Sequence, residues 1–407
     1  MIRFEHRAIP IALAAVLIDT IGFGIIAPVT PRLLLTLGDG DIEHATRAGG
    51  WMLVVFAATQ FLAGPVLGNL SDRYGRRPVL IASMLSFGID YALMAWAPTL
   101  AWLFLGRAIA GVAGAVYGPA GSVIADVTPP ERRGPAFALI GAAFGLGFIV
   151  GPALGGLMSY GGLRAPFIAA AVLALANAAA MFLLMPETLA TEHRRPFRLR
   201  DAHIVGAFAP LFRAGRAAPL LLGAFLWQLA HMVYPATWGF WATARFGFDA
   251  RAIGWSLALV GVLSVVVQGG LVGRIIAAIG ERRTLIVGLM CGATSFLASA
   301  FVTAPWQIVP LFVVGAFAGL AMPAIQGLLS RMVDASHQGQ LQGGMGSMGS
   351  VAAIVGPLML TQALATGIDR GFPGAAFLVA GLLGLAAAGI IWWKVLGRVA
   401  APVAPIA

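Results

Sequence analysis

The feature that most constrains this chain is a series of twelve apolar runs, each about as long as a helix that crosses a membrane. The runs cover residues 8–37, 49–69, 78–97, 99–125, 135–159, 164–186, 217–244, 252–273, 284–303, 305–331, 340–366 and 372–394. A helix needs about 20 apolar residues to cross a bilayer. The pattern therefore predicts an all-α membrane protein with twelve transmembrane helices.

Composition supports the same class. The 407 residues are 59% hydrophobic and 10% charged, whereas a soluble domain carries about 25% charged residues on its surface. The net charge of +10 comes mostly from arginines scattered in short loops, which positive-inside topology explains better than nucleic-acid binding does. The single cysteine, Cys291, excludes an intrachain disulfide and a cysteine-based metal site. The apolar stretch after Arg7 is too long for a cleavable signal peptide.

A polar, arginine-rich segment at residues 187–216 divides the runs into six and six. We therefore predict an N-terminal half at 1–186, a cytoplasmic linker at 187–216 and a C-terminal half at 217–407. Residues 199–211 are expected to form an interfacial helix. The loops on the side of the linker and of both termini hold most of the lysines and arginines, so both termini are predicted to be cytoplasmic.

An internal repeat supports two halves. The decapeptide 68–77 resembles residues 273–283 at an offset of 205, and Gly151-Pro152 matches Gly356-Pro357 at the same offset. Such repeats build many transporters, with the substrate site between the halves near the membrane midplane. The second copy has Ala277 where the first has Asp72, so the halves are not equivalent.

The decapeptide itself is predicted to be a tight loop between the second and third helices. Gly68 and Gly75 would allow close backbone approach and a positive φ. A generic positive-inside loop would explain its arginines, but not the ordered glycines or its one acid. Candidate gating residues are Gly68, Asp72, Arg73, Gly75, Arg76, Arg77 and, just after the fourth run, Asp126.

Three charges lie deep inside the apolar runs, away from their ends: Asp19, Asp90 and Arg107. A charge at the centre of a membrane helix costs about 2.5–3.5 kcal/mol, so each is a functional candidate. A buried carboxylate can exchange a proton near neutral pH, and proton coupling is the predicted role of the three. Static buried ion pairs are the alternative.

The seventh run carries an aromatic face. Spacings of three and four place Trp227, His231, Tyr234, Trp238 and Trp241 on one side of a helix. The face covers about 21 Å at 1.5 Å per residue, deeper than an interfacial aromatic belt. We predict that it contacts a flat, apolar substrate, although His231 could instead be a packing residue. The candidate substrate-binding residues are Gln60, Trp227, Gln228, His231, Tyr234, Trp238, Gln268 and Gln326, with Gln362 as a further candidate.

The fifth run is rich in glycine. Gly147, Gly151 and Gly155 lie four residues apart, so one face is bare backbone that a neighbouring helix can approach closely. Pro152 removes a backbone hydrogen bond and bends the helix, and Gly156 completes the pattern. These five residues form a predicted helix-packing motif.

Two of these motifs carry a resemblance. Residues 68–77 resemble the loop G-x-L-[AS]-D-R-x-G-R-[RK] of the major facilitator superfamily. Residues 147–156 resemble the G-x-x-x-G-P-x-x-G-G motif of its drug/proton antiporter branch. Further residues resemble the tetracycline/proton antiporter group: Asp19, Gly22, Gly24, Pro28, Pro31, Asp90, Tyr91, Asp126, Gln228 and Thr237.

The resemblance implies roles for some of these residues. Asp72 and Arg76 would help to close a cytoplasmic gate with Asp126 as a partner, and Arg107 would take part in proton coupling. We also predict that Asp72 caps the N-terminal end of the eleventh helix near 340–344.

The sequence departs from that group at two places. Its exporters carry an aspartate in the ninth helix and a histidine in the eighth, where this chain has residues 290–294 and 263–265 without either. Asp19 and Asp90 would then do most of the coupling.

The expected function is export of a small amphipathic, drug-like molecule in exchange for protons, by alternating access. A proton-symport importer of a metabolite or siderophore, and a non-transporting receptor, remain alternatives. No enzyme signature, cofactor or metal site is expected, and the proton gradient would supply the energy. The expected partners are a small-molecule substrate, protons and the lipid bilayer, without nucleic acid, and the chain is expected to be a monomer in the bacterial inner membrane.

Overall fold

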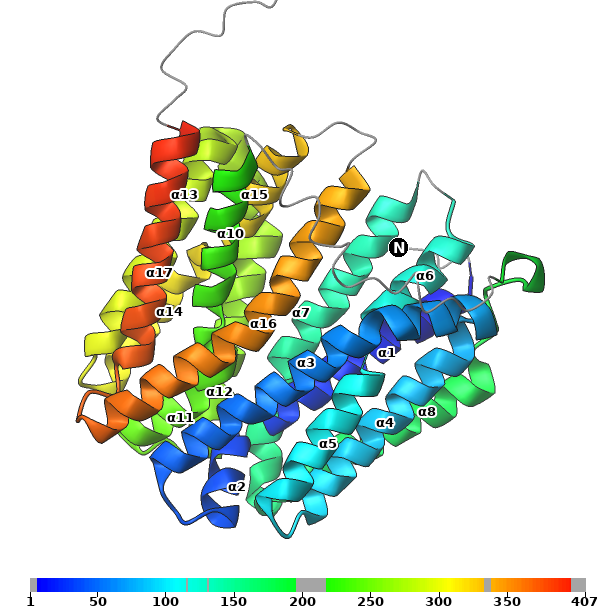
Figure 1. The fold of residues 1–407 in the computed structure, drawn as a ribbon, viewed down its shortest axis with the longest axis horizontal. Coiled ribbons are helices and arrows are strands. Elements are labelled where there is room, and N and C mark those ends of the chain that lie inside the picture. Colours follow the sequence, from blue (N-terminus) through cyan, green and yellow to red (C-terminus); the bar gives the residue numbers. More distant parts are fainter. Residues whose placement is uncertain (1–5, 115, 130–131, 195–216, 333–337, 397–407) are drawn as a thin grey trace, which may run out of the picture. The chain divides into compact units, whose positions relative to one another are not determined.

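The computed structural model describes residues 6–114, 116–129, 132–194, 217–332 and 338–396, and within these all regular structure is helical (Figure 1). The first eight helices are α1 (Ala8–Ile26), α2 (Thr30–Leu37), α3 (Ile42–Tyr74), α4 (Arg76–Trp96), α5 (Leu100–Ala113), α6 (Tyr117–Val127), α7 (Arg133–Met158) and α8 (Ala165–Leu184). The others are α10 (Ala218–His231), α11 (Val233–Phe246), α12 (Ala250–Val265), α13 (Val272–Phe301), α14 (Ile308–Ala316), α15 (Ala321–Ser330), α16 (Gln338–Asp369) and α17 (Ala375–Ile391). Short 3₁₀ or π segments lie at Ser159–Gly161, Thr191–His193, Val266–Leu271, Pro305–Gln307, Phe317–Leu320 and Trp392–Leu396.

Ten helical stretches in the described residues are long and apolar enough to cross a membrane. One of them, Ala250–Phe301, has 52 residues, more than twice the length of about 20 that one crossing needs. It is non-helical at Gly280, where φ is 79° and ψ is 160°. Leu100–Val112 is a shorter apolar helix within the predicted fourth run. The prediction of an all-α membrane protein is confirmed, and the number of twelve crossings stays a prediction.

Many large apolar side chains lie on the outside of the helices. Leu183 is 77% exposed, Trp306 71% and Trp393 73%. Soluble monomers rarely expose apolar side chains over large contiguous areas, whereas lipid tails cover such a surface at no cost. The exposed apolar residues therefore fit a lipid-facing surface.

Several predicted runs are interrupted. The first divides into α1 and α2 around residues 27–29, and the fourth into α5, which ends at Ala113, and α6, which begins at Tyr117. The tenth divides into α14 and α15 at the 3₁₀ segment Phe317–Leu320. The seventh divides at Met232, between α10 and α11. An apolar run records how much of a segment is hydrophobic, and it does not report where a helix is interrupted.

The predicted ten-residue loop at 68–77 is wrong. α3 continues to Tyr74 and α4 begins at Arg76, so Gly75 alone separates them. Gly75 has φ of 108°, a conformation that glycine adopts readily and other residues do not. Gly68 lies inside α3 and does not have a positive φ. The positive-φ prediction therefore holds for Gly75 and is wrong for Gly68.

The chain forms two compact units. Unit 1 takes the described residues of Met1–Ile204 and Gly247–Gly261, and unit 2 takes those of Val205–Phe246 and Val262–Ala407. The first part of α12 thus belongs to unit 1 by its packing. The predicted division at 1–186, 187–216 and 217–407 stays a prediction, and the interfacial helix at 199–211 lies outside the described residues.

The same packing pattern occurs inside each unit. In unit 1, α1 packs along α7 and α4 along α8; in unit 2, α10 packs along α16 and α13 along α17. Adding 205 to the residue numbers of α7 brings it onto α16, and adding 205 to α4 brings it onto the part of α13 that follows Gly280. Pro152 and Pro357 both lie within their helices, α7 and α16. The sequence repeat is therefore also a repeat of helix packing.

Candidate functional site

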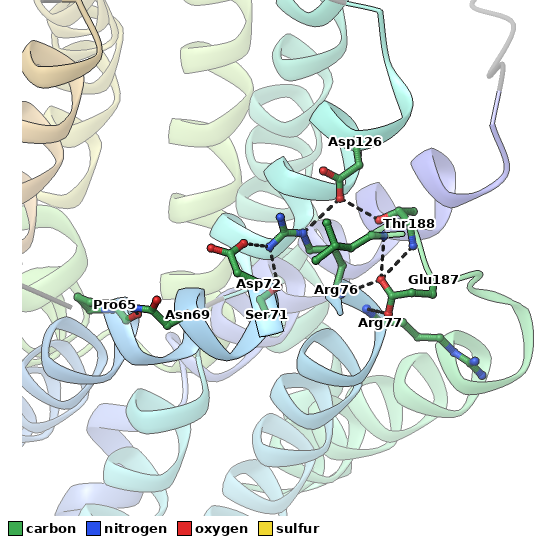
Figure 2. A network of polar contacts seen from close by, with 10 residues as sticks. Pro65, Asn69, Ser71, Asp72, Arg76, Arg77, Asp126, Glu187 and Thr188 are labelled. Atoms are coloured by element: carbon green, nitrogen blue, oxygen red, sulfur yellow. Dashed lines mark hydrogen bonds and ion pairs between the residues drawn. The ribbon is translucent and has the colours of Figure 1, made fainter. Parts of the chain in front are cut away.

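Arg76 lies at the centre of a polar network at the junction of α3 and α4 (Figure 2). Its Nη1 donates to Asp72 Oδ1 at 2.5 Å and to Ser71 Oγ at 3.2 Å, and its Nε donates to Asp126 Oδ2 at 3.2 Å. The side chain of Arg76 is only 11% exposed, so its charge is stabilised by these partners more than by water. The network links the end of α3, the start of α4 and the end of α6.

Glu187 joins this network, and the sequence analysis did not single it out. Its Oε1 accepts the backbone N–H of Arg76 at 2.8 Å, and its Oε2 accepts that of Arg77 at 3.2 Å. The first N–H groups of a helix have no partner within the helix, and a carboxylate there also meets the positive end of the helix dipole. Glu187 therefore caps α4, whose own N-cap residue is Gly75 and makes no side-chain cap.

The cap also explains why position 75 is glycine. A Cβ on Gly75 would collide with the Glu187 carboxylate, in addition to being strained by the positive φ. The same short segment binds Asp126, because Thr188 donates its hydroxyl to Asp126 Oδ2 at 3.2 Å. Residues just after α8 thus hold both α4 and α6.

The side chains of Arg73 and Arg77 contact aromatic rings outside the Arg76 network. Arg73 is exposed and its guanidinium lies 5.0 Å from the ring centre of Tyr74. The Arg77 guanidinium donates to the backbone oxygen of Phe182 and lies over the Phe182 ring. A Cβ added at Gly68 would meet no atom of its own unit within 4 Å, so the predicted close approach at Gly68 is wrong within unit 1. The structure brings together Asp72, Gly75, Arg76 and Asp126 from the predicted set.

Two of the three intramembrane charges form a buried ion pair. Arg107 in α5 pairs with Asp90 in α4, and its Nε donates to Asp90 Oδ1 at 3.2 Å. Asp90 is 0% exposed and Arg107 4%. The guanidinium also lies 5.6 Å from the ring centre of Phe56 and 5.8 Å from that of Tyr91, where cation–π attraction adds to the ion pair.

Asp19 differs from Asp90. It lies in α1 and is only partly buried, and the charge of Arg107 acts on it electrostatically. The three charges predicted from the sequence therefore lie in one region of unit 1. Asp90 forms an ion pair with Arg107, and the proton-coupling role of Asp19 stays a prediction.

The glycine face of α7 packs against α1. A Cβ at Gly147 would lie 2.7 Å from Thr20 Cβ, and one at Gly151 2.8 Å from Gly24 Cα. A Cβ at Gly155 would collide with the backbone of Ile25. Contacts this short leave no room for a side chain, so α1 and α7 meet backbone to backbone, as small residues allow in membranes.

Two further residues of this motif contact other parts of unit 1. Pro152 Cδ lies 2.7 Å from the position of a Cβ on Gly24. A Cβ on Gly156 would lie 3.4 Å from Gly254 Cα, in the part of α12 that packs with unit 1.

The aromatic face of the seventh run forms a continuous series of rings in unit 2. Ring centres lie 5.7 Å apart for Trp227 and His231, 6.5 Å for His231 and Tyr234, and 5.9 Å for Tyr234 and Trp238. Trp241 follows at 5.2 Å from Trp238. The prediction that these side chains share a face holds across the interruption at Met232.

Burial separates the members of this series. Trp227 is 1% exposed and Trp238 2%, and they pack on Phe296 and Phe312 respectively, with ring centres 6.0 Å and 5.0 Å apart. The structure gives these two rings a place in the core of unit 2. His231 is exposed. Contact between substrate and the predicted residues of this series stays a prediction.

The glutamines have varied surroundings. Gln60 donates to the backbone oxygen of Gly114 at 2.9 Å, at the interruption between α5 and α6. Gln228 Nε2 is buried without a hydrogen-bond partner among the described residues. Gln268 lies in the π segment Val266–Leu271 and is exposed, as is Gln326 in α15. Their contact with substrate also stays a prediction.

Comparison with known proteins decides the family. The family model described as the Major Facilitator Superfamily matches residues 12–357 and, in a second match, 235–407. The chain belongs to the major facilitator superfamily. As a member of the superfamily it is a multi-pass inner-membrane transporter and not an enzyme.

Two relatives of known type align with this chain over most of its length. It is 40% identical over 382 residues to the class C tetracycline resistance protein of Escherichia coli, covering 93% of this chain and 95% of that one. It is 37% identical to the class G tetracycline resistance protein of Vibrio anguillarum, over 86% of this chain and 88% of that one. The crystal structure of the human organic anion transporter MFSD10 has the same fold, with a TM-score of 0.70 and 24% identity over 95% of this chain and 99% of that one. The resemblance to tetracycline antiporters seen in the motifs is thus confirmed over most of the chain.

One signal for Glu187 was present in the sequence of this transporter. Glu187 directly follows Pro186, at the point where the sixth apolar run ends. An acid at that point is interpreted as the first residue of a polar linker. The neighbouring residues give no indication that it caps α4, more than 100 residues away in the sequence. Its role depends on the packing of α4 along α8, which the structure supplies.

Proposed function

We propose that this transporter exports a small amphipathic drug, with tetracycline as the first substrate to test, in exchange for protons. The observation that carries the proposal is the 40% identity to the class C tetracycline resistance protein over 93% of the chain. The halves would alternate between inward-open and outward-open states, with the substrate bound between them.

Asp19 is the proposed proton carrier. Its carboxylate lies in a membrane helix and is only partly buried, so it can be reached when the pathway opens. A proton would bind to Asp19 from outside and leave it inside, and each transfer would change the charge opposite Arg107. The buried pair of Asp90 and Arg107 would position that positive charge and would not itself exchange a proton in each cycle.

The substrate range is proposed to differ in detail from that of tetracycline exporters. The ninth and eighth helices lack the aspartate and histidine that such exporters carry, at residues 290–294 and 263–265. The exposed side chains of His231, Gln268 and Gln326 support recognition of a molecule with few charges. A panel of amphipathic drugs alongside tetracycline tests this directly.

The experiment measures both drug and proton in everted vesicles from an efflux-deficient host. Vesicles containing the protein should accumulate tetracycline or another drug of the panel when a pH gradient is generated. Addition of that drug should also release protons, measured as recovery of quenched acridine-orange fluorescence. Exclusion of the drug from vesicles together with its accumulation in cells would indicate import and would reject the efflux proposal.

Matched variants test the coupling assignment. Asp19→Asn should abolish drug-dependent proton release and uphill accumulation while drug binding persists, and Asp19→Glu should retain part of both because it keeps a carboxylate. Asp90→Asn should instead lower the amount of folded protein, because it leaves Arg107 buried without its partner, a loss of about 3–5 kcal/mol. Parent-level proton release by Asp19→Asn would overturn the assignment of Asp19.

A further inference from the structure

The second copy of the repeat contains an ion pair between Glu281 and Arg331. Glu281 is the first residue after Gly280, and Arg331 follows the last residue of α15. Arg331 Nη2 donates to Glu281 Oε1 at 2.8 Å. Both residues line a cavity of about 670 Å³ in unit 2, together with Arg282, Arg283 and Met332.

The 205-residue offset relates this pair to the one in unit 1. Arg76 moves onto Glu281, and Asp126 moves onto Arg331. Each pair joins the start of a helix that follows a positive-φ glycine to the end of the next membrane helix. The backbone is alike at both glycines, with φ 108° and ψ 164° at Gly75 and φ 79° and ψ 160° at Gly280.

The charges, however, are exchanged between the two pairs. In unit 1 the arginine follows the glycine and the acid lies at the end of α6. In unit 2 the acid follows the glycine and the arginine lies at the end of α15. The two pairs occupy matching positions, but the positive and negative residues are exchanged. This exchange indicates that the electrostatic attraction between the two positions is needed, whichever of them carries the positive charge.

The surroundings of Glu281 show that it depends on Arg331. The side chain of Glu281 is 17% exposed and that of Arg331 73%. Glu281 lies so close to α15 that a Cβ on Gly327 would be 2.9 Å from its Oε1. Its Oε2 is buried without a hydrogen-bond partner among the described residues. A mostly buried carboxylate needs a compensating charge, and Arg331 supplies it.

We propose that Glu281 and Arg331 are positioning residues for transport, forming in unit 2 the charge-exchanged counterpart of the Arg76–Asp126 pair. The pair holds the part of α13 that begins after Gly280 to the end of α15, on the side predicted to be cytoplasmic. This role rests on the proposed transport function. The pair in unit 2 differs from the pair in unit 1 in one respect: position 277 is alanine, whereas the matching position in unit 1 is Asp72, which shares Arg76 with Asp126.

Charge exchange within the second pair tests this role. Glu281→Arg and Arg331→Glu should each reduce drug transport by about fivefold or more, a coupling of the size found for contacting residues. The double variant Glu281→Arg/Arg331→Glu should recover at least about half of the parent rate. Arg282→Gln, at a neighbouring arginine of the same cavity, should transport like the parent.

The first pair provides a sharp contrast. The double variant Arg76→Glu/Asp126→Arg should not recover, because it places a second carboxylate beside Asp72 and removes the donor to Ser71. Recovery of the second pair without recovery of the first is the expected result. Equal failure of both double variants would overturn the proposal.

A second readout does not depend on any substrate. Cys291→Ser removes the native thiol, and Met332→Cys then places a single thiol at the wall of the cavity. Its rate of maleimide labelling reports how open the cavity is between the kink of α13 at Gly280 and the end of α15. Single charge reversals should speed labelling, and the double exchange should return it to the parent rate. Parent-like labelling in both single variants would overturn the positioning role. If labelling follows the expected pattern and no drug is transported by the parent, the proposed function fails while the ion-pair role stands.

Discussion

At the scale of single residues, the carboxylate of Glu187 connects parts of the chain that are far apart in sequence. It accepts the N–H groups of Arg76 and Arg77 and, within its own segment, those of Thr188 and Leu189. The segment that follows α8 is therefore tied to the start of α4. A displacement of that segment would therefore change the hydrogen bonds of the Arg76 network.

Glu187→Ala should destabilise the protein by about 0.5–2 kcal/mol, the usual effect of losing a helix N-cap. Glu187→Gln should cost less, because the amide oxygen still accepts a hydrogen bond while the charge at the helix end is lost. Thermal unfolding of purified protein in detergent measures the order. Glu192→Ala is the control, since Glu192 is exposed in Thr191–His193 and contacts only its own segment among the described residues. An equal effect of Glu187→Ala and Glu192→Ala would contradict the cap.

At the scale of helices, the glycines of α7 have opposite surroundings along one helix. Gly155 faces the backbone of Ile25, whereas a Cβ on Gly145 would meet no atom of its own unit within 4 Å. Gly155→Ala should separate α1 from α7 and destabilise the protein by about 1–3 kcal/mol, as overpacking does.

Gly145→Ala provides the matched control. It should be neutral or stabilise the protein by up to about 1 kcal/mol, because alanine favours the helix over glycine. Gly155→Ala should lower the unfolding temperature, whereas Gly145→Ala should leave it unchanged or raise it. A loss of stability as large for Gly145→Ala as for Gly155→Ala would show that the α1–α7 contact is not the cause.

The helices also show which features of the fold can be predicted from the sequence. Apolar length located nearly every membrane helix, because lipid exposure imposes that pattern on each segment separately. The spacing of Gly147, Gly151 and Gly155 predicted a close contact, though not that α1 would make it. The division of the fourth run into α5 and α6 and the π segment Val266–Leu271 were not predicted, because such breaks depend on the neighbouring helices and leave hydrophobicity unchanged.

At the candidate site, the sequence showed which residues carry charge inside the apolar runs, but it did not show which of these residues bind each other. Asp90 and Arg107 stood out as charges in apolar runs, but only the packing of α4 on α5 shows that they bind each other. The loop at 68–77 was expected from polarity, yet polar residues also end helices, and a single glycine suffices for the turn.

At the scale of the whole molecule, the repeat of 205 residues predicts a common orientation for both halves. Each half has six predicted membrane helices, so its ends return to the same side of the membrane. A reporter such as green fluorescent protein, which is active only in the cytoplasm, should fluoresce when fused after residue 407 and should not when fused after Gly162. Alkaline phosphatase at the same two positions should give the reverse result. Agreement of both reporters on a periplasmic C-terminus would reject the predicted topology.

The buried pair of Asp90 and Arg107 also bears on how the protein enters the membrane. An isolated arginine or aspartate opposes insertion of its helix by about 2.5–3.5 kcal/mol, and these two lie on consecutive helices, α4 and α5, separated only by residues 97–99. If the two helices leave the translocon as one hairpin, neither charge meets lipid alone. We therefore expect α4 to wait for α5 during synthesis, so that biogenesis and proton coupling place demands on the same two side chains.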